Sequence, residues 1–224
     1  MLSLIDALLK RKSVRAYLDK PVSRADIETI LNYARCAPSG TNTQPWDVAV
    51  VSGQIKQQLD AALLQQFTNC SPKQMDYNYY PVNHLPPHLN ARRIACGLQM
   101  YSALNINRED KQARILQWSK NYSAFGAPVA LYFFADSTLE KGSFIDYGMF
   151  LQSIMLMATA MGLATCPQAA LTEQPQIVKS FLGREKDDVV VVCGMALGYE
   201  DTSSHVNNYR TPRQEVSAFT KFYE

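Results

Sequence analysis

The loop from Ala37 to Trp46 has the residue types needed to bind something flat and polar. Its sequence, Ala-Pro-Ser-Gly-Thr-Asn-Thr-Gln-Pro-Trp, offers hydroxyls, amides and backbone N–H groups, and it leads directly into the apolar strand 48–51. A basic cluster, Arg11-Lys12-Ser13-Val14-Arg15, comes before it in the chain. Cations suit a phosphate and the donors of the loop suit a heterocycle, so the two segments together predict a bound nucleotide-like cofactor.

A second basic pair, Arg210 and Arg213, lies near the C-terminal end of the chain. Taken separately, each cluster reads as a solvated helix end or as ordinary surface, where basic residues are common. Taken together, their fork-shaped guanidinium groups could hold a phosphate dianion. The sequence contains neither the glycine-rich signature of a Rossmann dinucleotide site nor that of a P-loop, so we expect neither of these folds.

Other kinds of catalytic machinery are poorly represented in the sequence. Ser13 and Ser39 have no evident base nearby, and the prolines between His84 and His88 prevent the helix that would turn both toward one metal ion. The five cysteines form no C-x-x-C pair. We therefore expect no metal site, and a cofactor that carries the reactive atom while the protein positions it.

Composition limits the remaining possibilities. With 224 residues, 47% of them hydrophobic, the chain can build one sizeable core, and a net charge of +2 indicates no general affinity for nucleic acid. The odd number of cysteines and the lack of a signal-peptide pattern predict free thiols and a cytoplasmic location. The apolar run Phe144–Ala164 is long enough for a membrane span, but Asp146 and Gln152 within it favour a buried central helix.

Hydrophobic periodicity, capping residues and prolines predict one α+β domain over residues 1–224, with helices around a short sheet. Ser23 is a typical N-cap for the second helix, and Gly162 is a typical left-handed residue after the methionine-rich helix. We predict helices over 3–12, 24–37, 54–67, 89–105, 108–121, 144–161 and a segment ending at 183, strands over 46–52, 129–134 and 189–197, and irregular chain over 69–90 and 165–170.

Five segments resemble the motifs of the FMN-dependent nitroreductase family, in the order in which that family has them. The most specific is Pro38–Trp46, which is similar to the family's P-S-x-x-N-x-Q-P-W loop. The others are 11–15 (R-R-S-x-R in the family), 125–128 (F-x-A-P), 162–168 (G-L-x-T-x-P) and the basic tail 208–213. Position 12 is Lys where the family commonly has Arg, which keeps the charge but loses the fork.

The resemblance implies a nitroreductase-like α/β/α sandwich with a central, mainly antiparallel sheet. It also implies an intertwined homodimer with FMN sites at the subunit interface. Residues 69–122 would then be an inserted lid, the tail 199–224 would wrap the partner subunit, and helix 144–161 would form part of the dimer core.

The resemblance also assigns roles to residues of the site. Arg15 would approach the N1/O2 edge of the flavin, a backbone N–H near Ala169 would point at flavin N5, and Ser39 and Gly40 would come from the other subunit. Thr41 and Phe125 would border the substrate, with no catalytic side chain. The residues implied to bind or shape the FMN site are Arg11, Lys12, Ser13, Arg15, Pro38, Ser39, Gly40, Asn42, Pro167, Gln168, Ala169, Ala170, Arg210 and Arg213.

The implied activity is hydride transfer from NADH or NADPH through flavin N5 to an electron-poor acceptor such as a nitroaromatic or a quinone, with ping-pong kinetics. Two alternatives stay open: another flavin reaction on the same scaffold, such as reductive dehalogenation or flavin or enone reduction, and a non-catalytic FMN-binding protein. Tyr77, Tyr79, Tyr80, Arg92 and Arg93 either shape a substrate entrance or serve only as lid packing and solvated surface. The sequence names neither the natural acceptor nor the preferred nicotinamide donor.

Overall fold

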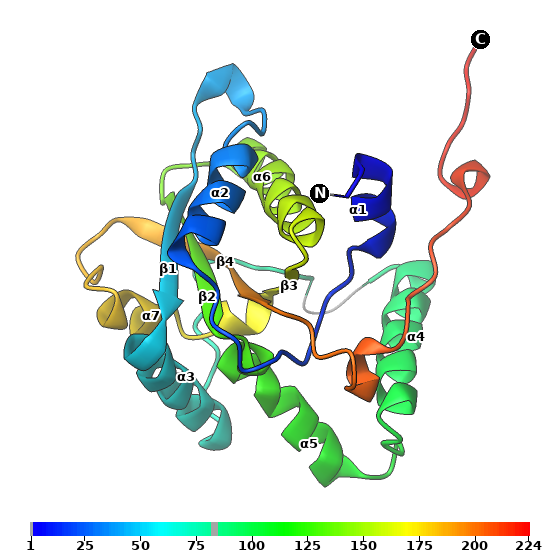
Figure 1. Cartoon of the computed structure of the whole chain (residues 1–224), viewed down its shortest axis with the longest axis horizontal. Coiled ribbons are helices and arrows are strands. Elements are labelled where there is room, and N and C mark those ends of the chain that lie inside the picture. Colours follow the sequence, from blue (N-terminus) through cyan, green and yellow to red (C-terminus); the bar gives the residue numbers. More distant parts are fainter. Residues whose placement is uncertain (1, 82–84) are drawn as a thin grey trace.

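In a computed structural model of the chain, which describes residues 2–81 and 85–224, an antiparallel sheet lies between two layers of helices (Figure 1). Its strands follow the order β1-β2-β4-β3, and every neighbouring pair is antiparallel. This confirms the predicted α+β sandwich. The strands are β1 (Asp47–Ser52), β2 (Val129–Asp136), β3 (Ala164–Gln168) and β4 (Val189–Gly198).

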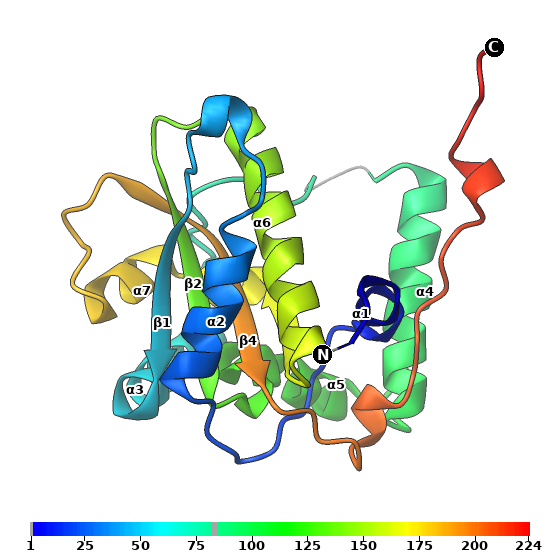
Figure 2. The same cartoon turned by 45° about the horizontal axis from the view of Figure 1, so that its top comes forward.

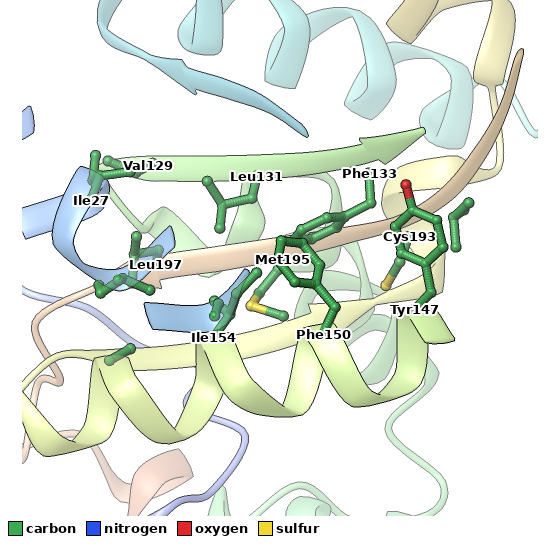
Figure 3. Packing of buried hydrophobic residues seen from close by; sticks show 14 of the residues in the cluster. Ile27, Val129, Leu131, Phe133, Tyr147, Phe150, Ile154, Cys193, Met195 and Leu197 are labelled. Atoms are coloured by element: carbon green, nitrogen blue, oxygen red, sulfur yellow. The ribbon is translucent and has the colours of Figure 1, made fainter. Parts of the chain in front are cut away.

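Helices α2 (Arg24–Ala34) and α6 (Lys141–Ala160) cover one face of the sheet. Alternate residues of β2, among them Leu131 and Phe133, point into this layer and meet Phe150 and Ile154 of α6 (Figure 3). The Trp46 ring, at the end of the polar loop, stacks on Phe150 with the ring centroids 4.7 Å apart. The loop is therefore anchored on the core.

Helices α3 (Gly53–Thr68) and α7 (Pro175–Phe181) cover the opposite face, together with the short 3₁₀ segments Lys120–Gly126 and Ala169–Thr172. The remaining residues of β2, including Tyr132 and Phe134, point into this second layer. Both faces of the central strands are buried, which explains why β2 and β4 read as continuous apolar runs rather than as alternating ones.

Three further helices, α1 (Leu4–Lys10), α4 (Pro87–Ala103) and α5 (Lys111–Ser119), lie outside the sandwich. In both views the C-terminal chain runs along α4, so the two ends of the polypeptide flank the same region of the molecule (Figures 1 and 2). Among the described residues, no helix combines the length and the apolarity that crossing a membrane would require.

The irregular chain before α4 runs alongside β4, next to the part of β4 that lies beyond the end of β3. The backbone N–H of Val191 donates to Asp76 at 2.8 Å, and the Tyr77 hydroxyl donates to the carbonyl of Val192 at 2.5 Å. This segment therefore satisfies an edge of the sheet that would otherwise be open. His84, which the sequence analysis discussed, lies outside the described residues.

Several of the predicted boundaries are wrong. Residues 165–168, predicted as loop, form most of β3, because Cys166 and Pro167 pair with Ala196 and Met195 of β4. Proline is tolerated there because β3 is the edge strand of the sheet. The second helix ends at Ala34 and does not reach Pro38, whereas the methionine-rich helix begins at Lys141, three residues earlier than predicted.

Candidate functional site

Four arginines from the two ends of the chain surround a cavity of about 290 Å³: Arg11, Arg15, Arg210 and Arg213. The Arg210 guanidinium donates to the backbone carbonyls of Lys10 and Arg11, at 2.6 and 2.7 Å, which holds the tail against the end of α1. Ser13 lines the same cavity and is bridged to Thr165 of β3. The structure thus brings the two basic clusters together within a single chain.

The positive charge of this cavity has little internal compensation. Burial lowers the pKa of the Arg11 guanidinium, and repulsion from Arg213 and then Arg210 lowers it further. The described residues that line the cavity include no acidic side chain. Lys12 differs from the arginines, because its ammonium is bound to Glu200 and to the carbonyl of Asn207, both at 2.6 Å. The arrangement of the arginines therefore suits an anion of more than one charge.

A second cavity, of about 870 Å³, adjoins the first. The two share Arg15, Cys96 and Tyr209 in their linings, and the Arg15 guanidinium donates to the Tyr209 hydroxyl at 3.2 Å. Pro167, Gln168, Ala169 and Ala170 line the larger cavity, so the end of β3 and the turn after it contribute a wall. The arginine-lined cavity thus opens into a space large enough for flat ring systems.

Two residues on the lining of the larger cavity have unusual surroundings or backbone geometry. The Gln168 side chain is 4% exposed, and its Oε1 has no hydrogen-bond partner although its Nε2 donates to the carbonyl of Asn121 at 3.0 Å. Phe125 lies on the lining with a φ of 56°. A bulky residue in the left-handed region costs free energy, and such residues are concentrated at functional sites.

Aromatic side chains line much of this cavity. Tyr77 and Tyr79 stack with centroids 5.1 Å apart, Tyr80 tilts against Tyr79 at 5.4 Å, and Trp118 and Phe125 also face the space. From the sequence, Arg92 and Arg93 are together candidates either for an entrance or for solvated surface. The structure separates them, since Arg93 lines the cavity and Arg92 does not.

The polar loop lies elsewhere in the single chain. Pro38, Ser39, Gly40, Thr41 and Asn42 line neither cavity. Instead the Gly40 N–H donates to Asp146 of α6 at 3.2 Å, and Ser39 Oγ accepts from the Gln44 N–H at 2.9 Å. The Tyr147 hydroxyl holds the end of the loop: it accepts from the Asp47 N–H at 2.8 Å and lies within hydrogen-bonding distance of the carbonyls of Pro45 and Phe134. A role for this loop in the site needs a second copy of the chain.

Asn207 is a residue of the site that the sequence analysis missed. It is 2% exposed, accepts from the backbone N–H of Arg15 at 2.8 Å, and donates to the carbonyls of Ala16 and Asp201, both at 2.9 Å. It therefore ties the tail to the segment that carries Arg15. Nothing in the sequence distinguishes it from Asn208, which is exposed.

Side chains that could bind a metal ion are not clustered in the portion of the chain that the structure describes. No group of three His, Cys, Asp or Glu side chains is placed to hold a metal ion there. Glu173, an acidic group on the larger cavity, is bound to Lys73 at 2.5 Å and to the Tyr122 hydroxyl at 2.6 Å. The arrangement is suited to binding and orienting rather than to side-chain acid–base chemistry.

Comparison with known proteins agrees with this geometry. The sequence profile described as "Nitroreductase family" matches residues 8–199. A 4-nitrobenzoate reductase of Pseudomonas putida is 40% identical over 216 residues, which is 95% of this chain and 92% of that protein. A nitrobenzene nitroreductase of Ectopseudomonas oleovorans is 36% identical over 221 residues, covering 97% of this chain and 96% of that one.

Solved structures of similar proteins superpose closely on this chain. The FMN and NADPH-dependent nitroreductase NfnB from Sphigopyxis sp. strain HMH has a TM-score of 0.94 at 36% identity, with all of both chains covered. The FMN-dependent nitroreductase NfnB from Mycobacterium smegmatis, solved in complex with NADPH, has a TM-score of 0.92 at 32% identity over 99% of this chain and 98% of that one. With both the sequence and the fold in agreement, this chain belongs to the nitroreductase family.

Proposed function

We propose that this protein is an FMN-dependent nitroreductase, which passes a hydride from NADPH or NADH to nitroaromatic acceptors. The observation that carries the proposal is the junction of two cavities at Arg15: an anion site made of uncompensated arginines opens into a larger space lined by β3 and by aromatic rings. FMN joins a phosphate dianion to a flat ring system, so its two ends match the two cavities.

The residues present fit this cofactor. Arg11, Ser13, Arg210 and Arg213 would hold the phosphate, because they line a cavity whose cations have no acidic partner within it. Pro167, Gln168, Ala169 and Ala170 would hold the ring, because they form one wall of the larger cavity. Lys12 would contribute little charge, since Glu200 already neutralises it.

When bound, FMN supplies the ring that accepts a hydride from the nicotinamide and passes it to the acceptor. The residues of this chain would bind the cofactor and adjust its reduction potential. Arg15 lies where the cavities meet and is held by Ser13, Tyr209 and Asn207. A fixed cation there favours negative charge on the adjacent part of the cofactor. The rings of Trp118 and Phe125 offer surface for stacking a flat acceptor.

The proposal includes a homodimer that completes each site. The apolar residues Leu4, Ile5, Leu8 and Leu9 of α1 are each at least 49% exposed in the single chain, which is unusual for one short helix. A partner that covers this surface could bring its own loop 38–42 to the cavities.

The free state of all five cysteines supports a reducing compartment, and we propose the cytoplasm.

Anaerobic titration tests the proposal. The protein mixed with FMN should retain a yellow colour after desalting, lose it on addition of NADPH or NADH, and regain it when a nitroarene is added. Retention of FMN without bleaching by either donor would favour a non-catalytic flavin-binding protein. Bleaching without reoxidation by nitroarenes would favour another flavin reaction.

Variants test the assigned residues. Arg15→Ala should weaken retention of FMN and make the bound cofactor harder to reduce, and Arg213→Glu should release the cofactor because it reverses a charge in the anion site. Arg35→Ala is the control, since Arg35 is exposed and lines neither cavity. The assignment would be contradicted if both site variants bound FMN as tightly as the wild type and the reduction potential of the bound cofactor did not change.

A further inference from the structure

We propose that Arg93 recognises a carboxylate on the aromatic substrate, so that the preferred acceptors of this protein are nitroarenes bearing an anionic group. The inference rests on the proposed function and adds the class of substrate to it. It also assigns to Arg93 a role in specificity that the family's motifs do not include.

The position of Arg93 follows from the face that α4 presents to the larger cavity. Arg93, Cys96, Gly97 and Met100 line it, at the i, i+3, i+4 and i+7 spacing of one helix face. Cys96 lies where the cation cavity and the aromatic cavity join. Arg93 is one helical turn from Cys96, and hence lies beside the ring-binding space rather than beside the phosphate site.

The charge of Arg93 is available to a ligand. Its Nε and Nη2 donate to Asn90 Oδ1, at 3.2 and 2.9 Å, and this neutral amide leaves the guanidinium charge unbalanced. None of the ion pairs among the described residues includes Arg93. The Asn90 contact also restricts the side chain, so that less freedom is lost when it binds a second group.

The other cations of the cavity are already committed. Lys73 is bound to Glu173 at 2.5 Å, and Arg15 belongs to the junction with the cofactor site. Within the described lining, Arg93 is therefore the cation that has neither a carboxylate partner nor a proposed cofactor role. A guanidinium fork binds a carboxylate through two parallel hydrogen bonds, which makes this group the natural ligand.

The aromatic lining of the cavity that Arg93 shares suits the rest of such a molecule. Tyr77, Tyr79 and Tyr80 offer ring faces, and the volume of about 870 Å³ is near the upper end of the usual range for ligand pockets. This leaves room for a flat substrate beside a bound cofactor. A substrate with an aromatic ring and a terminal carboxylate would meet aromatic side chains and the guanidinium of Arg93.

A second source could supply the same anionic chemistry, namely the 2′-phosphate of NADPH. We favour the substrate carboxylate because one unpaired guanidinium matches one negative charge, whereas a phosphate dianion is usually held by several cations, as in the arginine cluster of the first cavity. The two sources give different results in the experiment below.

The test compares 4-nitrobenzoate with 4-nitrobenzamide, which has the same shape and no charge. Steady-state kcat/KM is measured for the FMN-loaded wild type, Arg93→Gln and the control Arg92→Gln, whose residue is exposed on the same helix but does not line the cavity. Arg93→Gln should lower kcat/KM for 4-nitrobenzoate roughly tenfold or more, mainly through KM, with 4-nitrobenzamide within about twofold. Arg92→Gln should leave both substrates unchanged, and Arg93→Lys should restore only part of the loss.

Calorimetric titration with benzoate and benzamide, neither of which can be reduced, repeats the comparison without turnover. The wild type should bind benzoate more tightly than benzamide, and Arg93→Gln should lose that preference. Equal losses for charged and neutral ligands, or no loss for either, would overturn the proposal. A higher KM for NADPH but not for NADH in Arg93→Gln would reassign the residue to the donor's phosphate. If the wild type reduces neither nitroarene, the proposed function itself fails, and the inference with it.

Discussion

The guanidinium of Arg210 lies against the backbone carbonyl of Arg11, with its Nη1 2.7 Å from that oxygen. The two residues come from opposite ends of the chain, and both line the same cavity. This contact places a second cation beside Arg11 without using an acidic residue to do so. Positive charges that are held in position before an anion arrives need little reorganisation when it binds, which strengthens binding.

Asn207 should be as important to the cofactor site as the arginines are. Replacing it with Ala removes one hydrogen bond to the Arg15 backbone and two to carbonyls, and it leaves buried groups unpaired. We expect the free energy of unfolding to fall by about 1–3 kcal/mol and FMN affinity to fall as well. Chemical denaturation and fluorescence titration with FMN measure the two effects. The neighbouring Asn208→Ala, at an exposed position, should change neither.

Gly194 of β4 has no room for a side chain. A Cβ placed there would lie 2.5 Å from Cβ of Leu171, which belongs to the 3₁₀ turn Ala169–Thr172, and this turn includes two residues of the proposed ring-binding segment. Gly194→Ala should lower the free energy of unfolding by about 1–3 kcal/mol. It should also displace Ala169 and Ala170, so that FMN affinity falls. Thermal unfolding without FMN measures the loss of stability, and the increase in Tm when FMN is added measures the affinity for FMN.

The matched control for Gly194 is Gly97→Ala. A Cβ at Gly97 meets nothing within 4 Å, and the residue lies inside α4. Alanine there should raise stability by about 0.5–1 kcal/mol, because glycine loses more conformational freedom in a helix. A Gly194→Ala protein as stable as wild type would show that β4 and the turn are less closely packed than described.

Cys166 should make stability depend on pH in the alkaline range. Burial raises the pKa of its thiol to about 11 from 9.0, although Arg15 opposes the shift. The native state therefore favours the protonated thiol. This contribution is complete below pH 9.0 and is lost between pH 9.0 and about 11, as the unfolded chain releases its proton first. The full effect is on the order of 2–3 kcal/mol.

The difference in unfolding free energy between about pH 8 and about pH 11 measures this contribution. Cys166→Ala should show a smaller loss than the wild type over that interval, and Cys36→Ala, at an exposed position, should match the wild type. If the free energy of unfolding fell equally with pH in the wild type and in Cys166→Ala, the Cys166 thiol would not be the group that causes the pH dependence.

The aromatic end of the tail should stabilise the proposed dimer. Phe219, Phe222 and Tyr223 are 67, 80 and 89% exposed in the single chain, and such a concentration of exposed rings indicates a covered surface. Changing all three to Ser should weaken self-association by about 100-fold or more, since each buried ring contributes about 1.5–3 kcal/mol. Sedimentation equilibrium measures the effect, with Lys221→Ser as the control in the same segment. A triple variant that associates like the wild type would remove the tail from the interface.

Much of the fold could be predicted from local sequence. Ser23 caps α2 as predicted, with its Oγ accepting from the Asp26 N–H at 3.0 Å, and Gly162 has the left-handed φ, 78°, predicted for the residue after α6. Caps, glycine positions and apolar runs act over a few residues, so their effects can be read from the chain alone. The residue types of the anion site were likewise evident from the two basic clusters.

The tertiary structure decided what depends on contacts between distant residues. The segment Thr165–Gln168 is a strand only because β4 offers it a partner, and Lys12 is neutralised only because Glu200 folds back onto it. Asn207 and Asn208 have the same side chain, and only the fold buries Asn207. Likewise, Arg92 and Arg93 have the same side chain, and only the fold places Arg93 on the lining of a cavity. Sequence determines what each residue can do locally, whereas burial, pairing and direction are set by chain segments brought together in space.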